Sequence, residues 1–369
     1  MDSFLAGVLL VDGLTHGAVY VQLAVASVLV FSVTRVIFVA QGEFVTFGAL
    51  TLTGLLAGHV PGTLWLMLTL AVVSVLLDAL AALRREQPAA QVALTAARAL
   101  AVPLLIAAVT VWAAPRAWPL WATTLLALAI VTPLGPYTYR LAFEPLAHTS
   151  VLTLMIAAVG VHFAMTGLGL ALFGAEGSRN PTYWEGASTL GALRVSNQAL
   201  LTAMVSAFLL TALWLFFRYS LRGKALRASA IDRYGARLVG ISPARAGRLT
   251  FGVAAFLSAL AGVLAATGTT MFYNSGLLIG LKGFVAAVAG ALLSYPVAAV
   301  AALGLGLIES FGSFYASAYK EAIVFTAILP VLLWLSIKHR RAGGEARAAT
   351  SNRDVWRSSP PSWRSRSCH

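Results

Sequence analysis

The sequence predicts an all-α integral membrane protein, a polytopic helical bundle with about 9–11 spans. Three observations lead to this prediction. Of the 369 residues, 59% are hydrophobic and only 11% are charged, against about 25% charged residues in an ordinary soluble domain. The mean hydropathy is +0.83. Apolar stretches of about 20 residues, the length that a helix needs to cross a bilayer, recur along the chain.

The expected spans are read in order from the apolar stretches. A largely apolar stretch of 33 residues at 279–311 is too long for one span and too short for two. Since Pro296 removes an amide and clashes with the preceding turn, we expect Ser294-Tyr-Pro296 to break this stretch into two short helices or a re-entrant hairpin. A last span is expected at 321–338. The spans before it are expected at about 6–32, 37–58, 62–83, 99–114, 117–136, 148–173, 198–217 and 249–268.

A basic segment between two spans, residues 218–248, is the most informative part of the chain. It holds eight Lys or Arg residues and one acidic residue, Asp232. Such a segment cannot lie in lipid, so it must face the cytoplasm. We expect a short helix over about 226–239, ended by Gly240 and Pro243. A short cytoplasmic helix between spans suits the docking of a soluble motor and indicates a transporter subunit that is driven from outside itself.

The basic residues also set the orientation. With 218–248 inside, the alternation of spans also places 32–36, 84–98, 137–147 and the tail inside, provided that 279–311 returns to the side it entered, and these segments together hold 21 of the 26 Lys and Arg residues. The N-terminus is then outside and the C-terminus cytoplasmic. The net charge of +13 is therefore interpreted as a topology signal and not as a nucleic-acid footprint. We expect a membrane domain over 1–339 and a disordered basic tail over 340–369.

Two ionisable residues inside spans are candidate functional residues, because each is costly in lipid unless it is satisfied. Glu43, at the start of the second span, either orders a helix start or faces the translocation path, and Gly42 beside it allows close backbone approach. His162 lies mid-span and either lines a pore or forms an interhelical hydrogen bond. It has no His or carboxylate at i+3 or i+4, so metal ligation is not supported.

Other charges are expected near the outer surface. Asp12 and His16 share one helix face and are expected to pair. We expect Lys282 to reach the outer interface with its long side chain. Glu309 is expected to face Lys320 or Lys282.

The sequence shows no constellation typical of an enzyme. It has no GxxxxGK[ST] loop, no HExxH, no Ser-His-Asp arrangement and no paired-carboxylate site. Its one cysteine, Cys368, excludes a disulfide within one chain. We therefore expect no enzymatic activity, no cofactor and no bound metal.

Four stretches together resemble the permeases of the branched-chain amino acid ABC-transporter family, in particular the first of the two permease subunits. They span residues 10 to 338 and are specific in this order. The first runs from Gly13-Leu-Thr-His-Gly-Ala-Val-Tyr20 to Thr34-Arg-Val-Ile-Phe-Val-Ala-Gln-Gly-Glu-Phe44, and a shorter one is Tyr139-Arg-Leu-Ala-Phe-Glu-Pro-Leu146. The others are Leu226-Arg-Ala-Ser-Ala through Leu238-Val-Gly-Ile241 to Ala261-Gly262, and Gly280-Leu-Lys-Gly-Phe284 through Leu307-Ile-Glu-Ser310 to Tyr319-Lys-Glu321.

The resemblance implies a subunit of a bacterial inner-membrane importer. Its partners would be two cytoplasmic ABC ATPases, a second permease chain that makes a heterodimer, and a periplasmic or lipid-anchored solute-binding protein. The segment 225–241 would dock on an ATPase, and the chain itself would perform no chemistry. The residues that this assigns to ATPase coupling are Leu226, Arg227, Ala228, Asp232, Arg237, Gly240 and Ile241.

Departures from the family pattern leave the solute open between branched-chain amino acids and a related amide or urea. The chain has Phe38-Val-Ala-Gln-Gly42 where the family usually has Asn-Phe-Ala-His-Gly, lacks the usual glycine-rich turn near residues 289–296, and is longer around 84–114. The alternative function is a stand-alone secondary transporter or channel for a small polar solute. That alternative predicts buried charge pairs for ion coupling and needs no docking segment.

Overall fold

The computed structural model describes residues 3–116, 118–190, 193–292, 294–326 and 330. The chain divides into two units, Met1–Phe325 and Thr326–His369, and the second contains only two described residues. The predicted tail over 340–369, and most of the predicted span 321–338, therefore lie outside the described residues. All architecture below belongs to the first unit.

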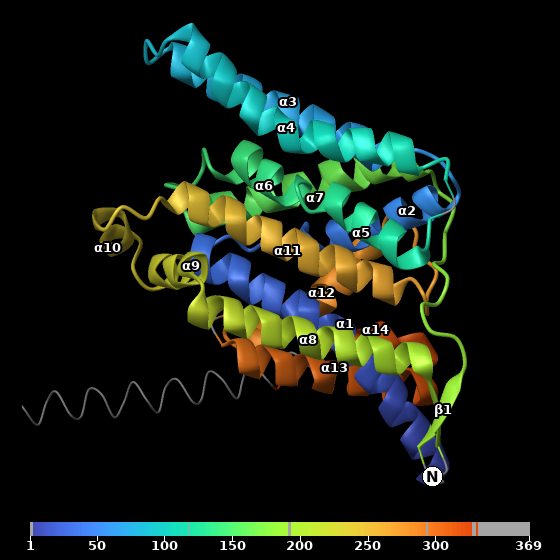
Figure 1. Cartoon of the computed structure of the whole chain (residues 1–369). Coiled ribbons are helices and arrows are strands. Elements are labelled where there is room, and N and C mark those ends of the chain that lie inside the picture. The colour runs from blue at the N-terminus through green and yellow to red at the C-terminus, as the bar shows by residue number, and fades with distance from the viewer. Residues whose placement is uncertain (1–2, 117, 191–192, 293, 327–329, 331–369) are drawn as a thin grey trace, which may run out of the picture. The chain divides into compact units, whose positions relative to one another are not determined.

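The first unit is built almost entirely of helices, which confirms the predicted fold class (Figure 1). Among the described residues, eight helical segments are long and apolar enough to cross a membrane, one of them the continuous segment Leu120–Phe143, and α2 and α12 are shorter helices. The helices are α1 (Ser3–Thr34), α2 (Gln41–Leu56), α3 (Gly62–Leu83), α4 (Ala89–Ala113), α5 (Leu120–Val131), α6 (Leu134–Thr138), the π-helical turn η1 (Tyr139–Phe143), α7 (Val151–Phe173), α8 (Asn197–Tyr219), α9 (Leu221–Ile231), α10 (Arg233–Leu238), α11 (Pro243–Ala265), α12 (Ser275–Ala289), α13 (Tyr295–Tyr315), the 3₁₀ turn η2 (Ser317–Tyr319) and α14 (Lys320–Thr326).

Two ends of the bundle serve as landmarks. Helices α9 and α10 lie at one end, called here the basic end, on the left in Figure 1. The short antiparallel hairpin of β1 (Ala187–Leu190) and β2 (Leu193–Ser196) lies at the other, the hairpin end. Helix α1 runs between the two ends.

Helix α1 is the centre of the bundle. It packs against α13, α11, α12 and α8, and its second half is buried on all sides. A helix that is apolar all round is expected in such an interior position. The helices around it, such as α3, α4, α7 and α8, expose large apolar side chains on their outer faces. In a membrane these faces contact lipid, so their exposure agrees with a membrane-spanning bundle.

Small residues set the spacing of the inner helices. A Cβ atom placed on Gly262 of α11 would lie 1.9 Å from the carbonyl oxygen of Val45 in α2. A Cβ atom on Gly42 would lie 2.0 Å from the carbonyl oxygen of Gly276 in α12. Helix backbones therefore touch at both places, as is common in membrane bundles. The close approach expected at Gly42 is confirmed.

The predicted break in the apolar stretch 279–311 is confirmed, but the pieces differ from expectation. α12 ends at Ala289 and α13 begins at Tyr295, with Pro296 in its first turn, where its missing amide costs nothing. Only α12, with 15 residues, is short, because α13 has 21 residues and is long enough to span. Their junction lies at the basic end, since Tyr295 packs on Phe217 at the end of α8.

One connection was predicted wrongly. The polar stretch 84–98 was expected to join two spans as a loop, yet α3 and α4 form a helical hairpin whose turn is confined to residues 84–88. Helix α4 begins directly after Pro88, and Arg98 is exposed on its surface. A single arginine is tolerated in such a helix because its long, exposed side chain can extend toward polar surroundings.

Candidate functional site

The basic segment begins with α9, which one buried leucine holds to the bundle. The Ser220 hydroxyl caps this helix by accepting a hydrogen bond from the Gly223 amide at 2.9 Å. Leu226 is buried against Leu29 of α1 and Phe217 of α8. Among the residues predicted for coupling, Leu226 is therefore an anchor and does not face a partner.

The segment holds two helices, so the prediction of one helix over about 226–239 is wrong. Asp232 is extended, with φ −143° and ψ 110°, and its carboxylate accepts a hydrogen bond from the Tyr234 amide at 2.9 Å. An aspartate that caps the next helix competes with continuation of the previous one. The predicted end is confirmed at Gly240, whose φ of +83° favours glycine.

Apolar side chains project from α9 and α10 away from the bundle. Four of them, called here the α9–α10 surface, are each at least 74% exposed: Ile231, Tyr234, Leu238 and Val239. These residues lie outside the spans, so lipid does not account for them, and a cluster of this kind is typical of a protein interface. These four residues were not predicted from the sequence, although apolar residues at i, i+3, i+7 and i+8 in an otherwise polar segment indicate an apolar helix face.

The other residues predicted for coupling take different positions. Arg227 is exposed and lines a cavity between α1, α8 and α13. Ala228 and Ile241 are half-buried, and Arg237 is exposed beside a second cavity. These side chains therefore lie on or next to α9 and α10, but they do not form one continuous contact surface.

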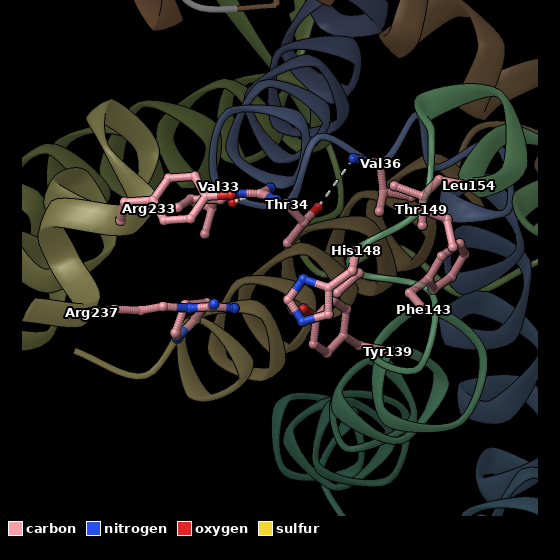
Figure 2. A pocket seen from close by; sticks show the side chains of 13 residues that line it. Val33, Thr34, Val36, Tyr139, Phe143, His148, Thr149, Leu154, Arg233 and Arg237 are labelled. Atoms are coloured by element: carbon pink, nitrogen blue, oxygen red, sulfur yellow. Dashed lines mark hydrogen bonds between the residues drawn. The ribbon is translucent and has the colours of Figure 1, made fainter. Parts of the chain in front are cut away.

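That second cavity, called here the arginine pocket, has a volume of about 250 Å³ (Figure 2). Arg233 and Arg237 of α10 line one side, and His148 lies across from them. The Arg233 guanidinium donates a hydrogen bond to the carbonyl oxygen of Val33 at 2.8 Å, which ties α10 to the end of α1. Burial lowers the pKa of Arg233, an effect that the electrostatic interaction with Tyr139 opposes and that the charges of Arg35 and Arg237 reinforce.

Helix α11 follows directly on the α9–α10 segment and is tied to its neighbours by ion pairs. The Arg248 guanidinium contacts both carboxylate oxygens of Glu144, at 2.9 and 3.1 Å. Arg140 bridges Glu144, at 3.3 Å, to Asp78 of α3. A displacement of α10 would therefore reach α1 through Arg233 and α3 through this chain of charges.

Within the bundle, the two singled-out ionisable residues face each other. Glu43 is fully buried in the first turn of α2, and its Oε1 atom lies 2.9 Å from Nδ1 of His162 on α7. The Thr166 hydroxyl donates to the His162 carbonyl at 2.9 Å. The sequence pointed to both residues but not to their pairing, because the periodicity of one helix says nothing about which helix faces it.

A second buried cluster centres on Lys282, and here one expectation is wrong. The Lys282 side chain is 5% exposed and its Nζ atom lies 2.6 Å from Glu309 and 3.1 Å from Glu321. It does not reach an interface, because two carboxylates and the ring of Tyr20 surround it. The prediction that Glu309 faces Lys282 or Lys320 is confirmed for both, with Lys320 at 3.6 Å.

These charges border a cavity of about 540 Å³ at the hairpin end, called here the hairpin-end cavity. The expected pair of Asp12 and His16 is confirmed at 3.6 Å and lies on its wall. The Ser310 hydroxyl, on α13, donates to Asp12 at 2.9 Å. Among the described residues, no group of three or more His, Cys, Asp or Glu side chains is arranged to hold a metal ion.

Residues 9–333 match the family described as "Branched-chain amino acid transport system / permease component". The chain belongs to this family. It is 32% identical over 246 residues to the high-affinity branched-chain amino acid transport system permease protein LivH of Salmonella typhimurium, and equally to LivH of Escherichia coli, covering 62% of this chain and 77% of each relative. It is 29% identical over 214 residues to the corresponding protein BraD of Pseudomonas aeruginosa, covering 56% of this chain and 70% of BraD.

One solved structure, PsaBC from Streptococcus pneumoniae in complex with Fab, aligns over 90% of both chains with 12% identity and a TM-score of 0.34, which is too low to support a conclusion about this fold. Family membership and the apolar helices together make the chain a multi-pass membrane permease.

Proposed function

We propose that this chain is the membrane-spanning permease subunit of an ABC importer for branched-chain amino acids or a related small amide or urea. The α9–α10 surface carries the proposal. Four exposed apolar side chains on a basic segment between two spans are unfavourable in water unless a partner covers them. A soluble ATPase that docks there would bury them.

The proposed orientation places the basic end in the cytoplasm. The excess of Lys and Arg in and around α9 and α10 supports this, as do Arg35, Arg140 and Arg248 at the ends of neighbouring helices. The N-terminus is then outside, and the hairpin-end cavity opens toward a solute-binding protein. The C-terminus is proposed to be cytoplasmic.

The proposed mechanism is mechanical. Two ATPases close when they bind ATP and displace the α9–α10 surface. Arg233 transmits the displacement to α1, while the ion pairs of Glu144 transmit it to α11 and α3. The permease then opens alternately to either side, with no chemical step in this chain and no cofactor. A second, different permease chain completes the pathway.

One observation favours the alternative of a stand-alone secondary transporter. Two pairs of ionisable side chains are buried inside the bundle, where Glu43 contacts His162 and Lys282 contacts Glu309. Such pairs serve ion coupling in some transporters. A stand-alone secondary transporter would have no use for the α9–α10 surface. Co-purification of ATPases with the chain therefore distinguishes the importer from the secondary transporter.

The test is affinity purification of the chain from native membranes in mild detergent, followed by mass spectrometry. We expect two P-loop ATPases and a second hydrophobic permease with the unchanged chain. The double variant Tyr234→Ser, Leu238→Ser should lose the ATPases, whereas the matched control Lys224→Ser, exposed on the same segment, should keep them. Recovery of the chain alone would contradict the proposal and favour the secondary transporter, and retention of the ATPases by the double variant would contradict the docking surface.

A further inference from the structure

The arginine pocket collects positive charge without a carboxylate in its lining. Arg233 and Arg237 of α10 line it, and His148 lies across from them (Figure 2). None of its 13 lining residues is acidic. Asp232, next to Arg233 in the chain, lies outside this lining, and its carboxylate accepts a hydrogen bond from the Tyr234 amide at 2.9 Å. A cavity lined by one sign of charge attracts ions of the other sign, so the pocket favours an anion.

Other arginines at the basic end are neutralised within the chain. Arg140 and Arg248 both contact the carboxylate of Glu144. Among the described residues, Arg233 donates only to a neutral backbone carbonyl, and the Arg237 side chain forms no hydrogen bond or ion pair. The two arginines of the pocket are therefore available to a partner that the described part of the chain does not supply.

Partial burial makes these unpaired charges costly. Burial lowers the pKa of Arg233, and the charges of Arg35 and Arg237 add to that effect. A guanidinium group nevertheless stays protonated in a protein, so these residues cannot relieve the repulsion by losing a proton. A bound anion would relieve it and would replace the hydration that burial removes.

A buried hydroxyl group lies on another wall of the pocket. Tyr139 of η1 lines the pocket and is 5% exposed, and its hydroxyl forms no hydrogen bond with the described residues. Gly247 of α11 makes room for the ring, since a Cβ atom there would lie 2.2 Å from its Cζ atom. A phenol is protonated at neutral pH and can donate a hydrogen bond. Tyr139 therefore adds a third donor group to the two guanidinium groups.

The size of the pocket and its donor groups favour one kind of anion. Its volume of about 250 Å³ lies below the range of about 300–1,000 Å³ for drug-sized ligands, so it suits a small group. A carboxylate has only two oxygen atoms, whereas a phosphate group presents three acceptor oxygens, one for each donor group. The planar fork of arginine also matches the geometry of phosphate.

We propose that the arginine pocket binds a phosphate group, with Arg233, Arg237 and the Tyr139 hydroxyl as its donors. The group belongs either to free phosphate or to the headgroup of a phospholipid, because both present the same oxygen atoms. This site goes beyond the proposed importer function, since it requires neither a motor nor a transported solute.

A bound phosphate group would join three elements of the fold. Arg233 and Arg237 belong to α10, Tyr139 belongs to η1, and Val33 and Thr34 at the end of α1 line the same pocket. The bridge would hold α10 against the bundle, so the amides of α10 should open less often. An effect on ATPase docking would follow if α10 is part of the docking surface, and that consequence alone rests on the proposed function.

Amide hydrogen exchange of the full chain tests the site without ATPases and without uptake. In one arm, the chain in detergent is titrated with inorganic phosphate at constant ionic strength, with chloride as the compensating anion. In the other arm, the chain is placed in lipid discs of phosphatidylcholine with or without phosphatidic acid, whose headgroup is a phosphate monoester. We expect exchange in α10 to slow by about fivefold or more in at least one arm, while exchange in α4 stays unchanged.

Three variants locate the response, each measured in the arm that responds. Arg237→Gln should raise the ligand concentration for half-maximal slowing by about tenfold or more, because it removes a charged donor that has no structural contact to lose. Tyr139→Phe keeps the ring and should raise that concentration by about threefold or more. Arg245→Gln is the matched control, because it removes the same charge from an exposed position on α11 outside the pocket, and its response should equal that of the unchanged chain.

The outcomes identify the ligand or reject the site. Slowing by inorganic phosphate assigns the pocket to free phosphate, and slowing by phosphatidic acid alone assigns it to a lipid headgroup. No slowing in either arm would overturn the proposal. An equal loss of response in Arg237→Gln and Arg245→Gln would also overturn it, because it would mean diffuse attraction to the basic end. Failure here leaves the importer function standing, and failure to recover ATPases leaves this site standing.

Discussion

The buried pair of Lys282 and Glu309 gives the sharpest prediction about stability. Their side chains are 5% and 7% exposed and lie 2.6 Å apart, and the Tyr20 hydroxyl donates to the same carboxylate at 2.5 Å. Removing one partner of a buried pair leaves an uncompensated charge and costs about 3–5 kcal/mol. Replacing both by apolar residues of similar size is often neutral.

We therefore expect Lys282→Met and Glu309→Met each to lower the free energy of unfolding by about 3 kcal/mol, the lower end of the range for a broken buried pair, because Lys320 still faces Glu309 in the first variant and Glu321 still faces Lys282 in the second. The double variant should cost less than either single one. The assay is unfolding by titration of mixed micelles with SDS. Asp12→Asn is the control, because it removes one member of the exposed Asp12–His16 pair, which is worth about 0.2–1 kcal/mol.

Two results would refute this reasoning. Single variants that cost no more than Asp12→Asn would mean that water or lipid headgroups reach the pair. A double variant whose cost equals the sum of the single ones would mean that the two side chains act independently.

Three further predictions concern packing, capping and coupling. Gly262→Val should cost about 3 kcal/mol or more, the upper part of the range for overpacking, because its Cβ atom would lie 1.9 Å from the Val45 carbonyl oxygen, and the folded yield in detergent should fall accordingly. Asp232→Ala removes the cap of α10 at a cost of about 1 kcal/mol, so amide hydrogen exchange in α10 should accelerate by about fivefold, while exchange in α11 stays unchanged. Arg227→Glu combined with Arg237→Glu should abolish ATP-dependent uptake and leave membrane insertion intact, and normal uptake would contradict the coupling assignment.

Much of the fold could be predicted from the sequence, because lipid restricts the length and the composition of the helices that cross it. Apolar length predicted the spans, and Pro296 predicted the break between α12 and α13. The same rules failed at 84–98, where a few polar residues suggested a loop although α4 already begins at Ala89. They also failed at Asp232, whose local cap outweighs the helical pattern around it.

The candidate site could be predicted from the sequence only in part, because it depends on which helices face each other. Composition marked Glu43 and His162 as costly but could not pair two residues 119 positions apart in the chain. Likewise, Lys282 was named as a possible partner of Glu309, but its burial could not be predicted because Glu309 lies on another helix. The α9–α10 surface was not predicted, because the eight basic residues of 218–248 dominate the composition of that segment and obscure the helical spacing of its apolar residues.

The most direct test of the central claim is uptake of radiolabelled leucine, valine, a small amide and urea into proteoliposomes that contain this chain with its co-purifying permease and ATPases. The binding protein is added on one side and ATP on the other. We predict uptake that requires both the binding protein and ATP, and that stops when the nucleotide sites of the ATPases are inactivated. Uptake by the chain without ATPases, driven by an ion gradient, would contradict it and establish a secondary transporter.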